Sequence, residues 1–140
     1  MAYVESTISL GIQIIVLGLL LSAIFLKIQK KYKQHGILML SAVLLHIVSI
    51  VVVMVPSLRA FFAIPGSVNF ADTVVIVTFV HVTAGLLAAL LGVWLVSSWH
   101  LQADLKPCFR KKRVMDFTIV LWSLAIVLGI VLYLAIIQHF

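Results

Sequence analysis

The chain has 140 residues, of which 64% are hydrophobic and only 10% charged, so an ordinary soluble domain is excluded and a single membrane domain over residues 1–140 is indicated. The formal net charge of +6 does not point to nucleic acid, because every Lys and Arg except Arg59 falls in two short loops between apolar segments. A lone cysteine, Cys108, excludes an internal disulfide framework and a CxxC redox pair.

The apolar segments follow one another in chain order, and each is long enough to cross a bilayer. They predict an all-α, four-helix transmembrane bundle with spans at about residues 8–26, 36–55, 73–99 and 117–137. The first span ends in lysines and has no small-residue cleavage site, which favours a retained span over a signal peptide. Gly11 and Gly18, seven residues apart, predict a contact face on it, and Gln13 is expected to hydrogen-bond a neighbouring helix.

The connection after the second span begins at Pro56, which is expected to close that span. It runs to Asp72 and contains three phenylalanines, so we expect it to lie in the membrane interface. Asp72 and Asp116 are each expected to cap the N-terminus of the span that follows.

The basic residues predict the orientation of the spans. They gather in the first loop, at 27–34, and in the last, at 100–115, whereas the middle connection holds only Arg59. Because positively charged loops stay in the cytoplasm, we expect a multi-pass protein of the cell membrane with both basic loops inside and the N and C termini outside. The same loops are expected to bind anionic lipid headgroups.

Histidines inside the spans are the candidate functional residues, because an ionisable group within a membrane usually faces a partner or a cavity. His46 lies at the middle of the second span and His81 in the outer half of the third. One face of the second span combines histidines with small residues: His35, Met39, Ala42, His46 and Ser49. The face of the third span below His81 has almost no side-chain bulk: Ala84, Gly85, Ala88 and Gly92. Such a bulk-free face allows either close helix packing or a flat cofactor beside it.

These faces predict haem b held between the second and third spans, with His46 and His81 as axial ligands and Gly85 and Ala88 lining the site. A second haem would use His35 and His100, a weaker pair because His100 lies about 100° around the helix from His81. No Cys-x-x-Cys-His is present, so any haem is non-covalent. For His46 and His81 the alternative is a structural hydrogen bond to a neighbouring helix. For His35 and His100 it is an ordinary histidine at the membrane interface, where that residue is common.

Three sequence elements carry a family resemblance: HGILML, FVHVTAG and WSLAIVLGIVLYL. Together they resemble the four-span membrane family catalogued as domain of unknown function 420. The chain departs from that family's pattern at Gly36, where Arg is usual, and near Lys111, where His is usual. The resemblance implies a neighbourhood of respiratory oxidase assembly and of haem-bearing four-helix membrane proteins, and it supports these positions: His35, Met39, His81, Trp122, Gly129 and Tyr133.

The leading hypothesis for function is a b-type cytochrome that passes electrons within or across the membrane. One alternative is an assembly or metal-handling protein for a haem-copper oxidase that uses the same histidines transiently. Another is a cofactor-free structural subunit. Expected partners are membrane lipids and respiratory-complex subunits or further copies of the chain, with no nucleic acid.

Overall fold

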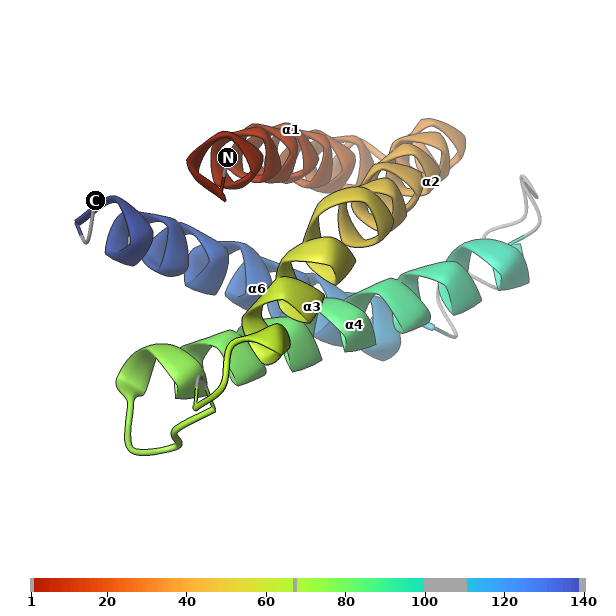
Figure 1. Cartoon of the computed structure of the whole chain (residues 1–140). Helices are drawn as coiled ribbons and strands as arrows, with labels where there is room; N and C mark the ends of the chain where they lie inside the picture. The colour runs from red at the N-terminus through yellow and green to blue at the C-terminus, as the bar shows by residue number, and fades with distance from the viewer. Residues whose placement is uncertain (1, 67, 100–110, 139–140) are drawn as a thin grey trace.

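The structure is a computed structural model that describes residues 2–66, 68–99 and 111–138, and these residues form helices and connections without any strand (Figure 1). The elements are α1 (Ala2–Ile28), α2 (Tyr32–Ser49), the π-helix η1 (Ile50–Met54), α3 (Val55–Ala63), α4 (Thr73–Trp99) and α6 (Lys112–Gln138). Among the described residues, four stretches are long and apolar enough to cross a membrane: Val4–Ile28, Tyr32–Ala63, Thr73–Ser98 and Lys112–Ala135. The predicted all-α membrane bundle is confirmed.

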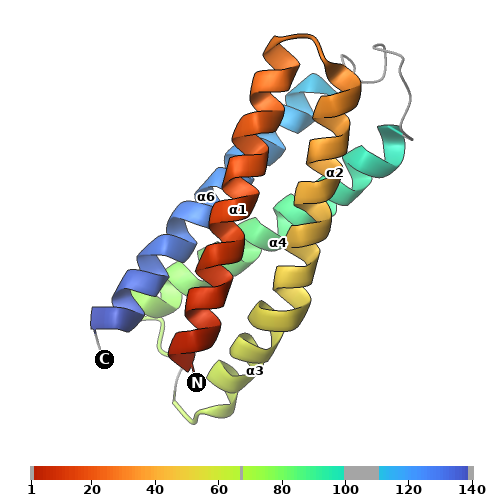
Figure 2. The ribbon, with the colours of Figure 1, turned by 90° about the horizontal axis from the view of Figure 1, so that it is seen from above.

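The helices pair as two hairpins that pack against each other. The most extensive contacts join α1 to α2 and α4 to α6, and smaller ones join α1 to α6 and α2 to α4. Figure 2 shows the start of α1, the end of α6 and the connection between α3 and α4 gathered at one end of the bundle. The turn between α1 and α2 and the start of α6 lie at the opposite end, and both stretches carry basic residues.

The interior of the bundle combines aliphatic, small and polar residues around one large aromatic ring, Trp122, which is fully buried. Many large aliphatic side chains point outward, as expected where lipid and not water surrounds the protein. The buried polar residues are Gln13, His35, His46, Ser49, His81 and Thr118. Tight packing and polar contacts therefore hold the helices together.

The turn between α1 and α2 is a Schellman motif. The backbone N–H of Lys31 donates to the carbonyl of Leu26 at 2.9 Å, and that of Lys30 donates to Lys27 at 3.0 Å. Lys30 occupies the left-handed position that usually takes glycine, with φ of 62°. This turn brings α2 back along α1.

The second span does not end at Pro56, contrary to the prediction. Proline has no N–H to donate and its ring crowds the carbonyl four residues earlier. The helix accommodates both effects by widening into η1, where the N–H of Val55 donates to the carbonyl of Ile50, five residues back. It then continues through α3 to Ala63, so about half of the predicted interfacial connection is helical.

The other predicted boundaries have mixed outcomes. Asp72 caps α4 as expected, since its Oδ1 accepts from the backbone N–H of Val74 at 3.0 Å. Asp116 is not a cap, because α6 already begins at Lys112; its carboxylate instead pairs with Lys27 Nζ of α1 at 3.5 Å. The face predicted from Gly11 and Gly18 makes no contact within the described part of the chain, because a Cβ built at either glycine meets no atom within 4 Å.

Candidate functional site

Three buried histidines hydrogen-bond backbone carbonyls of neighbouring helices and so link all four spans. His35 Nδ1 of α2 lies 2.6 Å from the carbonyl oxygen of Ala23 in α1. His46 Nε2 of α2 lies 3.1 Å from that of Gly85 in α4. His81 Nδ1 of α4 lies 2.8 Å from that of Ala125 in α6. The hydrogen-bonding alternative for His46 and His81 therefore describes this structure, and His35 is bonded in the same way.

The residues that accept these bonds explain why the bonds can form. Ala23, Gly85 and Ala125 all have minimal side chains, so an imidazole can reach the carbonyl beside them. A helical carbonyl already accepts one N–H from within its helix, and its second lone pair remains for the imidazole. Small residues in the spans thus provide accessible acceptors as well as close contacts.

The bulk-free face of α4 lies against its neighbours. A Cβ built at Gly85 would lie 3.9 Å from Ala125 Cβ of α6, and Ala88 is completely buried. At Gly92 a built Cβ would come within 2.9 Å of Val43 Cγ2, so α2 and α4 cross at van der Waals distance there. Two uses were expected of this face, close helix packing or a flat cofactor, and the structure shows close helix packing.

The residues in this arrangement do not fit a haem between His46 and His81. The Nε2 atom of His46 is engaged by Gly85 O, and the His46 ring packs on Trp122 with centroids 5.0 Å apart. Gly85 and Ala88 contact protein where a macrocycle would have to lie. Ligation by this pair stays a prediction, and it requires α2 and α4 to separate.

The second predicted haem pair is only half described. His35 is buried and faces α1. His100 lies outside the described residues, as does Cys108. Among the residues that the structure describes, no group of three or more His, Cys, Asp or Glu could hold a metal ion.

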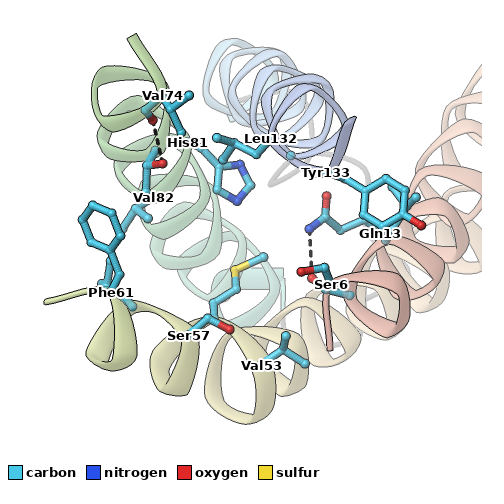
Figure 3. A pocket seen from close by; sticks show the side chains of 16 residues that line it. Ser6, Gln13, Val53, Ser57, Phe61, Val74, His81, Val82, Leu132 and Tyr133 are labelled. Carbon is cyan, nitrogen blue, oxygen red and sulfur yellow. Dashed lines mark hydrogen bonds between the residues drawn. The ribbon is translucent and has the colours of Figure 1, made fainter. Parts of the chain in front are cut away.

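A pocket of about 300 Å³ opens near the end of the bundle where α1 begins and α6 ends, opposite the basic loops (Figure 3). Its volume is at the lower limit of sites that bind small organic ligands. Its walls come from α1, η1, α3, α4 and α6, and its polar members are Ser6, Ser9, Gln13, Ser57, Thr78, His81 and Tyr133. The remaining wall is apolar apart from the thioether of Met54.

Two polar groups meet at one wall of this pocket. A Cβ built at Gly129 of α6 would overlap Gln13 Oε1 and lie 3.1 Å from His81 Cε1, so both side chains depend on the missing side chain at Gly129. Gln13 Nε2 donates to Ser9 Oγ within α1 at 3.2 Å, so the expected bond from Gln13 to a neighbouring helix is not made. Its Oε1 is buried and has no hydrogen-bond partner among the described residues. Figure 3 shows the Gln13 amide and the His81 ring directed into the pocket.

Sequence reasoning found His81, but it did not find the pocket around it. Gly129 and Tyr133 entered only through the family resemblance, and the hydroxyl residues Ser6, Ser57 and Thr78 were not singled out. One signal was available, because these polar residues all lie near the span ends that meet at the same end of the bundle.

Comparison of the chain with known protein families, with curated proteins and with solved structures finds no match.

Proposed function

We propose that this chain is a multi-pass membrane protein that binds a small, mainly apolar molecule of the bilayer in the pocket beside His81. The observation that supports this most directly is the preformed cavity of about 300 Å³, whose mainly apolar lining also includes His81.

The residues of the site would have different roles in binding. Apolar side chains such as Leu10, Leu58 and Leu132 would enclose the body of the ligand and exclude water. Gln13 and His81 would orient it by hydrogen bonds. The bond from His81 Nδ1 to Ala125 O fixes the imidazole ring, which makes the second nitrogen, Nε2, available to the ligand.

The same bond favours a second candidate function, in which His81 Nε2 ligates a metal. A histidine that ligates through one nitrogen usually donates its other N–H to a carbonyl or carboxylate. Met54, a soft thioether ligand, also lines the pocket. These residues fit a single copper ion better than a haem, given the volume of about 300 Å³. This candidate is compatible with a metal-handling role for a haem-copper oxidase. It is also compatible with a b-type cytochrome that transfers electrons, if the helices separate.

For the orientation we propose that both basic loops face the cytoplasm of a cell membrane and bind anionic headgroups. The distribution of Lys and Arg supports this, because Arg59 is the only basic residue in the middle connection. The pocket would then open in the outer half of the bilayer.

Native mass spectrometry and a visible spectrum of the full chain in lipid nanodiscs test the proposal. Gly129→Ala places a methyl group against Gln13 Oε1 and His81, whereas Gly11→Ala makes the same change in open space. We expect wild type and Gly11→Ala to retain a bound small molecule. The amount retained by Gly129→Ala should be at least about tenfold lower.

A wild-type chain without any bound molecule would refute the proposal, as would equal retention by the two variants. A reduced haem band that disappears in His81→Ala, or copper that co-purifies and is lost with His81→Ala, would replace it by the second candidate.

A further inference from the structure

Helix α3 forms one wall of the pocket and is held less firmly than the spans around it. It contributes Ser57, Leu58 and Phe61 to the lining, yet none of its residues is buried. In the described part of the chain its only extensive contacts are with η1, the element before it. Figure 3 shows α3 at one side of the pocket and Tyr133 of α6 at the other. The position of this wall therefore depends little on packing against the rest of the bundle.

The backbone that leads into α3 is weakened at η1. The N–H of Val55 donates to the carbonyl of Ile50, five residues back, and the next residue, Pro56, has no N–H. The carbonyl of Val51 is thus left without the donor that an α turn or a π turn would supply. Helices bend where their ladder of hydrogen bonds is interrupted in this way. Helix α3 can therefore turn about η1 with little loss of backbone hydrogen bonding.

The far end of α3 does not fix the helix either. The chain leaves the helical conformation at Ile64, which has φ of −84° and ψ of 118°. Residues 64–72 then lead to α4, which begins at Thr73. A connection of this length allows the end of α3 to move relative to α4.

Aromatic rings join α3 to α4. The ring of Phe62, which is 49% exposed, meets that of Phe79 edge to face with centroids 6.2 Å apart. Phe70 of the connection also contacts Phe79, at 5.5 Å. An aromatic pair shifts an equilibrium by about two- to tenfold. Because lipid solvates apolar rings as well as protein does, no hydrophobic penalty opposes their separation. The rings favour the observed position of α3 without fixing it.

We propose that α3 is a hinged lid of the pocket, which turns about η1 and is held closed by the contact of Phe62 with Phe79. Outward movement of α3 carries its lining residues away from the opposite wall and opens the cavity of about 300 Å³ to the bilayer. A small apolar molecule then enters from lipid, and closure encloses it. The inference rests on the proposed function, since it states how that same pocket is entered. The hinge itself is a property of the chain without ligand.

Distances between spin labels on the full chain in nanodiscs test the lid without any added ligand. In a Cys108→Ser background, one label pair joins α3 to α6 through Ala60→Cys and Leu134→Cys. The reference pair joins α1 to α6 through Ile15→Cys and the same Leu134→Cys. All three label positions are exposed and lie outside the pocket lining. We expect a broad or two-peaked distance distribution for the α3–α6 pair and a single narrow one for the reference pair.

Variants locate the latch and the hinge. Phe79→Ala removes the ring contacts and should raise the population at longer distance about two- to tenfold. Phe25→Ala, the same change at an exposed ring of α1, is the control and should leave the distribution unchanged. Pro56→Ala supplies the missing N–H and should lower the population at longer distance about twofold or more. Thermal unfolding of each variant checks that it is folded.

An α3–α6 distribution as narrow as the reference and unchanged by Phe79→Ala would overturn the inference, and so would an equal response to Phe25→Ala. A rigid α3 in a chain that retains a molecule, and loses it with Gly129→Ala, would overturn the lid while leaving the proposed function in place. Movement of α3 in a wild-type chain that retains no molecule would support the hinge and refute the proposed function.

Discussion

The helix crossing at Gly92 gives a quantitative prediction that can be isolated from other effects. Gly85 and Gly92 are both buried in α4 and both face a neighbouring helix, so Gly→Ala at either position brings the same gain of about 0.5–1 kcal/mol from reduced backbone freedom. The space differs. A Cβ at Gly85 lies at an ordinary 3.9 Å from Ala125 Cβ, whereas a Cβ at Gly92 lies 2.9 Å from Val43 Cγ2.

Valine is stiff at χ1 and cannot easily move its methyl aside, so the helices must shift at Gly92. Overpacking of this kind costs about 1–3 kcal/mol. Gly85→Ala should therefore be slightly more stable than wild type. Gly92→Ala should be less stable than Gly85→Ala by about 1–3 kcal/mol, because the backbone gain cancels between them.

Reversible unfolding in mixed micelles measures both free energies. Val43→Ala removes the crowding methyl, so the double-mutant cycle should show that Gly92→Ala loses most of its cost in that background. Equal stability of Gly85→Ala and Gly92→Ala, or a cost at Gly92 that persists without Val43, would show that the close approach of α2 and α4 is wrong.

Four further predictions follow from other features. His46→Ala should lower the free energy of unfolding by at least about 0.6 kcal/mol, the average for hydrogen bonds between membrane helices, and an unchanged value would mean that the bond to Gly85 O contributes nothing. Trp122→Phe should lower the free energy of unfolding by less than the roughly 3–5 kcal/mol of Trp122→Ala, because the buried Nε1 of Trp122 has no hydrogen-bond partner among the described residues; equal losses in the same unfolding assay would contradict this. An impermeant thiol reagent should label Cys108 only after cells are opened, and labelling of intact cells would reverse the proposed orientation. Neutralising Arg110 to Arg113 should reduce bound anionic lipid in native mass spectra by about 1 kcal/mol of affinity per charge, and undiminished binding would limit these residues to orienting the chain.

The number and type of the spans could be predicted from sequence because bilayer thickness determines how long an apolar helix must be. The ends of the spans were less predictable. Pro56 is an ordinary helix terminator in water, but inside a membrane every backbone polar group needs a partner, and a π turn meets that need while the helix continues. Asp116 looked like a cap because the sequence cannot show that Lys27 of another helix lies beside it.

The histidines illustrate what a sequence pattern leaves undetermined. An imidazole in a membrane needs a polar partner, and a metal or a backbone carbonyl meets that need equally well. His46 and His81 are buried as expected, but the partner of each depends on how the helices are rotated against one another, which helical spacing within one span does not determine. The pocket could not be predicted for the same reason, because its polar residues come from separate elements and meet only through tertiary packing.

The hairpin pairing of the helices has a consequence for biogenesis. Since α1 contacts α2 most extensively and α4 contacts α6, each hairpin can assemble from consecutive segments as they leave the ribosome and enter the bilayer. The pocket, in contrast, takes its walls from both hairpins. It comes into existence only when the second hairpin docks on the first, so any molecule that binds there stabilises the completed insertion product over the half-assembled one. Supply of that molecule during synthesis would then raise the yield of mature protein, and its shortage would leave the chain exposed to membrane quality-control proteases.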